Sequence, residues 1–514
     1  MISRGHSFVL QGIDAIACEI EADLSSVGLP KVTIVGLPDI AVKESVERVR
    51  TAILNSGFRY PNLRLTINLA PADVKKEGPV FDLPIAIALL SADGTIEKIT
   101  TIDGAARPSL EHYLIAGELA LDGRIRPIRG AISLAMLAKT LSSKGIVGVI
   151  LPQDNAPEAA AVDGIDVIGV TSLGQVVSFL NGNVDLQPHQ QVDAEQMIAH
   201  TTPQFDFGDI RGQEAAKRAV TIAAAGGHNL LMLGPAGTGK TMMAKALPGV
   251  LPPLSREEAL EVTRIYSSVG QIAKGQSLVV ERPVRSPHHT ASSPAIIGGG
   301  STPRPGEVSL AHRGVLFLDE MPEFSRDVLE TLRQPLEDGH VTIARAHGSI
   351  TFPARFMLVA ALNPTAKGDM ATDEISQRAM DRYLSKISGP LIDRIDIHIE
   401  VPAVPYKQLT GQQRGTDTET IRQQVAQARQ VQQQRQGVKV NAELSGKQLN
   451  TYAALDEQSK VVLGQAMTEL KLSARAYDKV RRIARTIADL EGVESVQMPH
   501  VLEAVQYRLL DRRL

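Results

Sequence analysis

Residues 227–247 read GHNLLMLGPAGTGKTMMAKAL, and this stretch decides the fold class of the middle of the chain. An apolar run over residues 229–233 predicts a buried strand, and a helical pattern resumes after a glycine-rich segment. That segment completes the pattern G-x-x-x-x-G-K-[ST] with Gly234, Pro235, Ala236, Gly237, Thr238, Gly239, Lys240 and Thr241. Its glycines let backbone N–H groups wrap phosphates, Lys240 would reach the β- and γ-phosphates of ATP, and Thr241 would hold Mg²⁺. The strand–loop–helix order favours a phosphate-binding loop over a chance glycine-rich turn.

Two further apolar strands end in polar side chains that suit phosphate chemistry. The run 314–318 is followed by Asp319 and Glu320, of which the first can act on the Mg²⁺ shell and the second can polarise an attacking water. The run 356–362 is followed by Asn363, whose amide can bind the γ-phosphate or orient that water. Each feature alone is an ordinary strand end or an Asn-Pro turn. Downstream of a phosphate-binding loop, they predict one nucleotide site.

The composition limits the class of protein. The chain has 514 residues, which indicates two or three domains, and its 43% hydrophobic and 22% charged content is that of a globular protein without a membrane partner. Its one cysteine, Cys18, excludes a disulfide framework and fits a reducing cytoplasm. No signal peptide or membrane-spanning run is expected. A net charge of −3 excludes a uniformly basic coat, so any DNA contact must come from local basic loops.

The order of patterns along the chain predicts three domains and one linker. Residues 1–181 alternate short strand-like and helix-like runs, which favours an α/β domain. Residues 182–205 are polar and aperiodic, as in a linker. Residues 206–404 form the predicted nucleotide-binding α/β core. Residues 405–514 are helical, and the Gln- and Arg-rich part is expected to be an exposed helix face.

The three nucleotide motifs, in this order, resemble those of the AAA+ ATPases. The resemblance implies ATP and Mg²⁺ as cofactors and places Asp209, Ile210 and Gln213 on the adenine side. It also makes Arg394, in GPLIDRIDIHIEV, an arginine finger that reaches the nucleotide of the next subunit, and thus implies a homo-oligomeric ring. Without the resemblance, Arg394 reads as a local salt bridge to its neighbouring aspartates. A finger arginine raises turnover by about 10³–10⁵-fold in P-loop enzymes.

A basic helical stretch in the C-terminal part carries a second arginine of this kind. LSARAYDKVRRIARTIADL resembles the lid helix of the same family, and Arg475 matches its sensor-2 arginine. The resemblance thus completes a catalytic set of Glu320, Asn363, Arg394 and Arg475. The alternative is a solvated basic helix face, which is the expectation for Arg481 and Arg482.

The stretch from residue 285 to 324 narrows the resemblance to the magnesium-chelatase-like branch, and within it to the ComM (YifB-type) family. Members are described as hexameric helicases that promote branch migration of recombination intermediates during natural transformation. The resemblance therefore implies DNA, single-stranded and branched, as a partner. A chelatase-type or protein-remodelling ATPase stays as the alternative. The cysteine cluster that many members carry is missing from residues 365–388, so no zinc function is expected there.

Four residues are candidates for DNA contact. HVTIARAHGSITF predicts a β-hairpin whose tip carries Arg345 and His347, and the related helicases place such a hairpin in the pore of the ring. An incidental arginine on an exposed hairpin is the alternative. Arg282 and Arg285 flank the loop that contains His288 and His289. Adjacent histidines in extended chain point apart, and no cysteine is near, so a metal site is not expected at that loop.

The first domain resembles the proteolytic domain of Lon-type proteases, which use a serine–lysine dyad. The resemblance rests on residues 28–57, 75–86 and 117–135. Val80 stands where the serine would be and Ile132 where the lysine would be. Lys75 and Lys76 lie near the loop, but no serine or threonine is there to pair with them. We therefore expect no protease activity and favour a role in assembly or DNA engagement.

Overall fold

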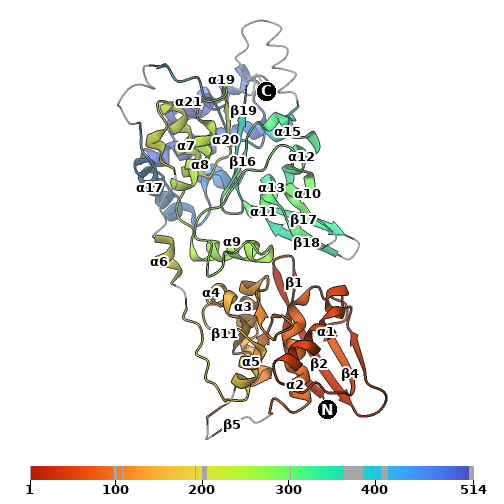
Figure 1. Ribbon diagram of the computed structural model, residues 1–514. Helices are drawn as coiled ribbons and strands as arrows, with labels where there is room; N and C mark the ends of the chain where they lie inside the picture. The colour runs from red at the N-terminus through yellow and green to blue at the C-terminus, as the bar shows by residue number, and fades with distance from the viewer. Residues whose placement is uncertain are drawn as a thin grey trace. The chain divides into compact units, whose positions relative to one another are not determined.

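The computed structural model describes residues 2–97, 101–102, 105–106, 108–191, 193–199, 205–300, 302–345, 348–363, 386–406 and 415–508. The chain divides into two compact units (Figure 1). The first comprises Met1–Met197 and Arg256–Val279, and the second comprises Ile198–Ser255 and Val280–Leu514. In the ranges described, no helix combines the length and apolar character needed to cross a bilayer.

A mixed seven-stranded sheet forms the base of the first unit. Its strand order is β11-β10-β7-β1-β2-β4-β3. The long strands β1 and β2 pair antiparallel over the whole of β1, whereas β1, β7, β10 and β11 run parallel. The strands are β1 (Ile2–Gln11), β2 (Asp14–Ser25), β3 (Lys31–Val35), β4 (Arg64–Ala70), β7 (Tyr113–Ile115), β10 (Gly148–Pro152) and β11 (Asp166–Val170).

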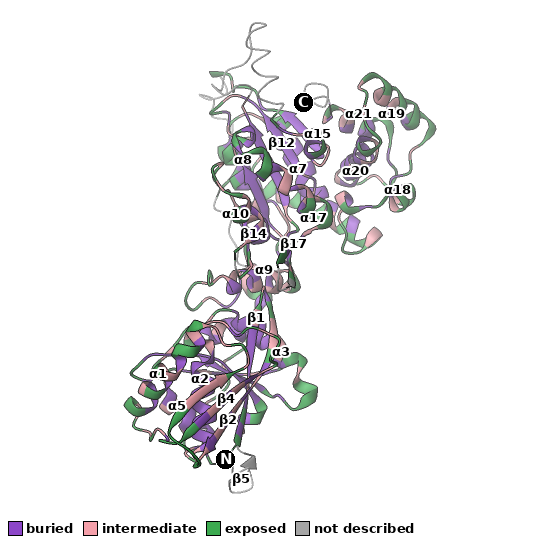
Figure 2. Ribbon diagram, turned by 90° about the vertical axis from the view of Figure 1, so that its right-hand side faces the viewer, coloured by how far each residue is buried: buried purple, intermediate pink, exposed green. Residues whose placement is uncertain are grey.

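Helix α2 (Asp82–Ala92) forms the centre of the first unit. All of its residues are buried, and it packs against β1, β2 and α1 (Ile40–Asn55). The sequence DLPIAIALLSA is apolar around the whole helix, and such a helix is stable only when protein surrounds it. Figure 2 shows much of both units' sheets as buried. The other helices are α3 (Ala131–Thr140), α4 (Ala156–Ala159), α5 (Leu173–Leu180) and α6 (Ala194–Ala199).

One segment expected in the nucleotide-binding core folds with the first unit instead. Helix α9 (Arg256–Ser268) and the chain up to Val279 belong to that unit. The apolar face of α9 packs against α3, and the Ser267 hydroxyl accepts a hydrogen bond from the Gly130 N–H at 3.0 Å. Ion pairs add to this contact, including Lys274 Nζ to Asp154 Oδ2 at 3.1 Å. The segment thus follows its packing partners rather than its position in the sequence.

The second unit contains a five-stranded parallel sheet in the order β13-β16-β19-β12-β20. This confirms the predicted α/β fold with a P-loop core, and Figure 1 shows α7 (Glu214–Gly226) and α8 (Lys240–Ala246) beside it. The strands are β13 (Val284–Arg285), β16 (Val315–Leu318), β19 (Met357–Leu362), β12 (Leu230–Leu233) and β20 (Ile397–Glu400). The predicted hairpin is present as β17 (His340–Arg345) and β18 (Gly348–Pro353).

The C-terminal part is helical, as predicted. It contains α17 (Thr418–Gln436), α18 (Gly446–Tyr452), α19 (Glu457–Glu469), α20 (Ala474–Leu490) and α21 (Met498–Gln506). The expectation of a solvated face for Arg481 and Arg482 was wrong. Arg481 is 6% exposed and its guanidinium donates to the Leu449 and Ala453 carbonyls, while Arg482 donates to the Leu444 carbonyl. Both arginines cap the ends of neighbouring chain segments, because helix C-termini leave carbonyls without partners.

Candidate nucleotide site

The loop between β12 and α8 has the backbone of a phosphate cradle. Gly237 and Gly239 adopt φ values of 77° and 93°, which side-chain-bearing residues rarely adopt. Gly234 is constrained differently, since a Cβ atom there would lie 2.1 Å from the Val401 carbonyl oxygen. The glycines of the motif are therefore required by conformation and by close approach to β20. The sequence predicted this loop from its spacing alone.

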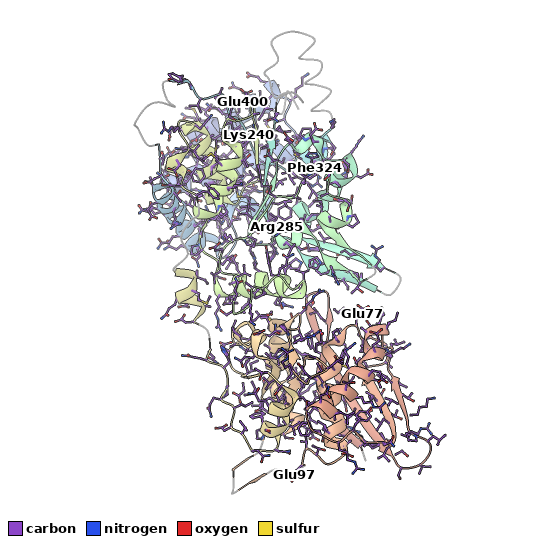
Figure 3. All side chains as sticks on the ribbon, in the orientation of Figure 1. Glu77, Glu97, Lys240, Arg285, Phe324 and Glu400 are labelled. Atoms are coloured by element: carbon purple, nitrogen blue, oxygen red, sulfur yellow. The ribbon has the colours of Figure 1, made fainter. Side chains whose placement is uncertain are left out.

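Lys240, labelled in Figure 3, is held inside this loop. Its ammonium donates to the Gly234 and Pro235 carbonyls, both at 2.7 Å, and to Asn363 Oδ1 at 3.2 Å. Burial lowers the pKa of Lys240, and the nearby carboxylates of Asp319 and Glu320 oppose that shift. A cation in this position attracts the phosphate groups of a nucleotide at short range.

Two pairs of side chains meet beside Lys240 at the carboxyl ends of neighbouring parallel strands. Thr241 Oγ1 donates to Asp319 Oδ2 at 3.0 Å, and Asn363 Nδ2 lies 3.5 Å from Glu320 Oε1. Glu320 adopts a left-handed conformation, with φ 50° and ψ 48°. A non-glycine residue in this region is strained, and such strain clusters at functional sites. The turn after β16 thus presents Glu320 outward, where it is exposed.

The donor set fits a nucleotide with Mg²⁺. A hydroxyl and a carboxylate oxygen that are already in contact are ligands that Mg²⁺ accepts, and Mg²⁺ keeps its remaining positions for water and phosphate. Thr241 and Asp319 would hold the ion, and Lys240 with the loop amides would hold the phosphates. The structure therefore brings together five of the predicted residues: Lys240, Thr241, Asp319, Glu320 and Asn363.

The residues predicted on the adenine side lie at the start of the second unit. Ile210 is 4% exposed, and its Cγ2 would be 3.7 Å from a Cβ placed on Gly239, so it borders the loop. Gln213 has φ 60°, and its side-chain amide donates to the Pro402 carbonyl at 2.6 Å. Asp209 is exposed at the end of a 3₁₀ turn, η5 (Phe207–Asp209). Of the three, Ile210 is the residue that borders the glycine-rich loop.

Arg394 does not make the local salt bridge that its sequence neighbours suggest. Its guanidinium pairs with Glu337 of α13 (Arg333–Asp338) and donates to the Pro390 carbonyl at 2.7 Å. Asp396 is engaged elsewhere, by the Asn229 N–H and by Lys479. Arg394 borders a cavity of about 450 Å³ that is also lined by Glu330, Arg333 and Glu337. The described contacts of Arg394 thus lie outside the P-loop.

Arg475 is exposed on the first turn of α20. Sequence reasoning missed three polar residues that lie deeper in the unit, namely Asn229, Asp396 and Lys479. Each is polar at or beside an apolar run, and that pattern is the only signal in the sequence that could have pointed to them. Their contacts are described below.

The candidate DNA contacts differ in what holds them. Arg345 is exposed at the end of β17, opposite Gly348, and the hairpin tip at His347 lies outside the described residues. The Arg282 guanidinium donates to the carbonyls of Pro252, Pro253 and Arg313, at 2.6, 3.3 and 2.6 Å respectively. Arg285, labelled in Figure 3, makes a two-pronged ion pair with Glu307. These contacts give Arg282 and Arg285 structural roles, and Arg345 keeps the clearest access to solvent.

The two histidines of the adjacent loop do not point apart, contrary to the expectation for extended chain. The His288 and His289 rings stack at 4.1 Å between centroids with a tilt of 32°. His288 Nδ1 lies 2.9 Å from Thr290 Oγ1, and the His289 ring meets Phe324 edge-on. Within the described ranges, no group of three or more His, Cys, Asp or Glu side chains is arranged to hold a metal ion.

Packed aliphatic side chains stand at the two positions in the first unit where the resemblance to Lon-type proteases would place a serine and a lysine. Val80, in the 3₁₀ turn η1 (Pro79–Phe81), packs against the core, and Ile132 is 0% exposed in α3. The Ile132 N–H donates to buried Glu158 at 2.9 Å, and the Ser267 hydroxyl of α9 donates to the same carboxylate oxygen. Burial raises the pKa of Glu158. This carboxylate therefore fastens α3 and α9 rather than activating a nucleophile.

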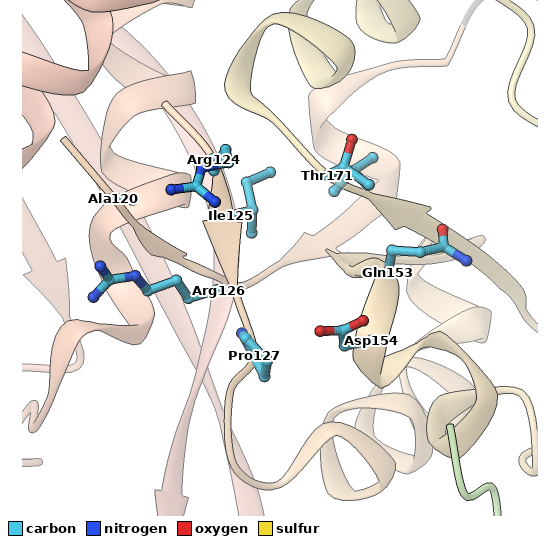
Figure 4. A pocket seen from close by; sticks show the side chains of 9 residues that line it. Ala120, Arg124, Ile125, Arg126, Pro127, Gln153, Asp154 and Thr171 are labelled. Carbon is cyan, nitrogen blue, oxygen red and sulfur yellow. The ribbon is translucent and has the colours of Figure 1, made fainter. Parts of the chain in front are cut away.

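The lysines near the loop are engaged too. Lys75 is exposed and pairs with Glu77 at 2.7 Å, whereas Lys76 is 0% exposed and donates to the Pro71 carbonyl. A separate cavity of about 390 Å³ in this unit is bordered by Arg124, Arg126, Asp154 and Thr171 (Figure 4). Thr171 is its only hydroxyl, and Gln175 accepts the hydrogen bond of that hydroxyl at 3.0 Å.

Comparison with known proteins identifies the family. Family models described as magnesium chelatase subunit ChlI match residues 206–409 and 20–155, and a model of its C-terminal part matches residues 415–508. The chain is 43% identical to the competence protein ComM of Haemophilus influenzae, over 99% of this chain and 98% of that protein. It is also 43% identical to YifB of Escherichia coli, over 100% and 98%. The 38 kDa magnesium-chelatase subunit of Rhodobacter capsulatus is 30% identical over 34% of this chain and 53% of its own length. The chain therefore belongs to the ComM/YifB family of magnesium-chelatase-like AAA+ proteins.

Proposed function

We propose that this protein is an ATP-hydrolysing motor that acts on DNA as a ring of identical copies. In this proposal the ring is a cytoplasmic hexamer that promotes branch migration of recombination intermediates during natural transformation. The observation that carries it is the meeting of Lys240, the Thr241–Asp319 pair and the Asn363–Glu320 pair at the ends of adjacent strands. A name that associates the Haemophilus relative with competence supports the link to DNA.

The geometry supports a division of labour in ATP hydrolysis. Lys240 and the loop amides would bind the phosphates, and Thr241 with Asp319 would hold Mg²⁺, which adds positive charge to the phosphate oxygens. The Glu320 carboxylate, exposed next to Asn363, would accept a hydrogen bond from the attacking water and orient it. Asn363 already contacts Lys240 and Glu320, so it would keep the two at a fixed separation.

The placement of Arg394 supports a ring. Arg394 borders a cavity together with Glu337, with which it pairs, and its described contacts lie outside the P-loop of its own copy. In the proposal, Arg394 reaches the nucleotide of the neighbouring copy, while Arg475 of the lid contacts the nucleotide of its own copy. An arginine supplied in this way accounts for about 10³–10⁵ in turnover in other P-loop enzymes.

The hairpin supports DNA as the partner. Arg345 is an exposed cation at the end of a regular antiparallel pair, and such a cation can contact phosphate groups of any sequence. A motor that moves along DNA needs contacts that carry no sequence information, because the sequence changes at each step.

The test measures ATP hydrolysis with single-stranded, duplex and forked DNA while light scattering follows the oligomeric state. We expect stimulation by DNA, assembly into a ring, and movement of a branched junction that requires Lys240. Arg345→Ala should preserve ATP hydrolysis in the absence of DNA. It should also reduce by about 1 the slope with which the logarithm of the DNA-binding constant falls with the logarithm of the salt concentration. Lys460→Ala, at an exposed position of α19, should leave that slope unchanged. ATP hydrolysis that responds to none of these DNAs would overturn the proposal.

A chelatase-type or protein-remodelling ATPase is the second candidate. All three matched family models carry magnesium-chelatase descriptions, which favours it specifically. Co-purification with a dedicated protein subunit that stimulates hydrolysis, in the absence of DNA binding at low salt, would support this candidate. A protease is disfavoured, since Val80 and Ile132 cannot act as nucleophile and base.

A further inference from the structure

Behind the phosphate-binding loop, the second unit contains a buried ion pair that the nucleotide chemistry does not use. Asp396 and Lys479 are each 7% exposed, and Lys479 Nζ lies 2.8 Å from Asp396 Oδ1. Asp396 precedes β20 and follows Arg394 by two positions. Lys479 lies on α20, four residues after Arg475, and residues four apart share one face of a helix. The pair thus joins the Arg394 segment to the helix that carries Arg475.

The carboxylate of Asp396 is held on its other side as well. Its Oδ2 accepts the Asn229 N–H at 3.0 Å and lies 3.7 Å from His228 Nδ1. Burial alone would raise the pKa of Asp396, but the charge of Lys479 holds it well below its usual range. Burial lowers the pKa of Lys479, and the Asp396 carboxylate opposes that shift. A charged pair in a poorly polarisable interior is costly to separate.

Asn229 joins the segment that contains Arg394 and Asp396 to the strand that leads into the phosphate-binding loop. Its side-chain Nδ2 donates to the Arg394 carbonyl at 3.2 Å, and its Oδ1 accepts the Leu358 N–H at 2.8 Å. The main-chain carbonyl of Asn229 accepts hydrogen bonds from the N–H groups of Asp396 and Ile397, at 3.1 and 3.0 Å. The backbone of Arg394 is therefore fixed relative to β12 and β19 by directional bonds on several sides.

Further contacts hold the segment against the C-terminal helices. His228 Nε2 lies 2.9 Å from Thr486 Oγ1 on α20. Arg508 Nη1 donates to the Ile395 carbonyl at 2.6 Å and to the Asp396 carbonyl at 3.1 Å. A shift of α20 would therefore act on the segment through the Lys479 ion pair and the Thr486 contact.

We propose that Asp396 and Lys479 are positioning residues that couple the orientation of α20 to the placement of Arg394. When α20 shifts on nucleotide binding, the ion pair carries the shift to the backbone of Arg394, and the arginine offered to the neighbouring copy moves with it. This inference rests on the proposed function, in which Arg394 acts on the neighbouring copy's nucleotide. Hydrolysis in one copy would then depend on the nucleotide state of the adjacent copy.

The principal test compares variants of the full-length chain in steady-state ATP hydrolysis. The double variant Asp396→Asn/Lys479→Met removes the pair without leaving an unpaired buried charge, and its asparagine oxygen can still accept the Asn229 N–H. We expect kcat to fall about tenfold, while KM and the affinity for ADP change little. Lys479→Arg should keep most of the activity. Lys460→Met, which breaks the exposed Lys460–Glu457 pair on α19, is the matched control and should have no effect.

A mutant cycle separates coupling from simple loss of structure. In the unmodified chain Arg394→Ala should lower kcat by about 10³-fold or more, but in the double variant it should cost about tenfold less, because Arg394 is already misplaced. Additive losses would overturn the coupling while leaving the proposed function intact. Full hydrolysis by Arg394→Ala in the unmodified chain would instead overturn the role of Arg394.

Hydrogen exchange on the unmodified chain gives a test that does not depend on how the variants fold. A non-hydrolysable ATP analogue should alter exchange over residues 474–490 and at the Asp396 and Ile397 amides together, since these amides bond to Asn229. A response of residues 474–490 without any response at these two amides would overturn the inference.

Discussion

The two units each contain a Gly-Pro loop that leads into a helix and buries a lysine, yet the two loops differ in the carboxylates beside them. Lys76, near Gly78-Pro79, is 0% exposed, and Lys240, in the loop that begins Gly234-Pro235, is 6% exposed. Both ammonium groups donate to backbone carbonyls of their own loops. Burial lowers the pKa of each lysine. A sequence search for a lysine in a tight loop would treat them alike.

The carboxylates near the two loops make the difference. Asp82, which follows the first loop, is 0% exposed and is saturated by Arg48 Nε at 2.9 Å, Arg48 Nη2 at 3.1 Å, the Leu119 N–H and the Ser45 hydroxyl. Asp319 and Glu320, which border the second loop, keep oxygen atoms toward solvent. A buried carboxylate whose partners are all supplied by the protein stabilises a fold, whereas a partly exposed one can accept a ligand.

Within the comparison of the two loops, the largest effect on turnover is expected at Lys240. Lys240→Ala removes the cation from the phosphate cradle and should lower ATP turnover by about 10²–10³-fold, in the range seen when one electrostatic contact to a transition state is lost. The matched variant in the other loop, Lys76→Met, should leave turnover unchanged. Turnover measured with saturating Mg²⁺ and ATP decides this, and an equal loss in both variants would end the distinction between the loops.

The next effect concerns the stability of the first unit. Arg48→Ala leaves the buried carboxylate of Asp82 without its cation and should lower the free energy of unfolding by about 3–5 kcal/mol. Arg124→Ala, which breaks the exposed pair with Asp122, should cost about 0–1 kcal/mol. Urea unfolding of the two variants compares these costs. Equal costs would show that burial of Asp82 does not matter.

A smaller loss is expected for Lys76→Met. The Pro71 carbonyl would lose its donor, and leaving one buried polar group unpaired costs about 1–3 kcal/mol. Cys18 can report the change, because burial raises the pKa of its thiol to about 11 and makes native labelling at pH 8 slow. The charge of Lys76 lowers that pKa, so its loss cannot by itself speed labelling. Faster alkylation of Cys18 in the variant therefore measures opening of the unit, and an unchanged rate would argue against the role of Lys76.

The smallest effect is a pH dependence at Glu158. Burial raises the folded pKa of Glu158 above its ordinary value of 4.5, so the stability that it contributes is fully present below that value and is lost as the pH rises through the folded pKa. Near pH 4.5 the Glu158→Gln variant should therefore be no more stable than the parent chain. At higher pH its free energy of unfolding should rise by about 1 kcal/mol relative to that of the parent. Thermal unfolding of both chains, measured from pH 4.5 upward, shows whether the stability of the variant rises relative to that of the parent. A parent that gains on the variant as pH rises would contradict it.

The sequence predicted that the strand ends at Asp319 and Asn363 would meet the glycine-rich loop, because these positions depend on local geometry. The spacing of Gly234 to Thr241 fixes a loop conformation within one strand–loop–helix unit. Asp319 and Asn363 were found for a related reason, since the carboxyl ends of parallel strands meet at one edge of a sheet. The assignment of α9 to the first unit was not predictable in this way, because it depends on contacts such as Gly130 with Ser267, 137 positions apart.

Sequence by itself determined the parallel-sheet core and the helical C-terminal part, since each follows from residue type and local spacing. Only the tertiary structure decided which charges are available. It buried Arg481 and paired Arg285 with Glu307. It also paired Asp396 with Lys479, which lies 83 positions later in the chain. The physical reason is that the energy of a charged side chain depends on its solvent access and nearest partners. Both are properties of the packed chain rather than of any short stretch of it.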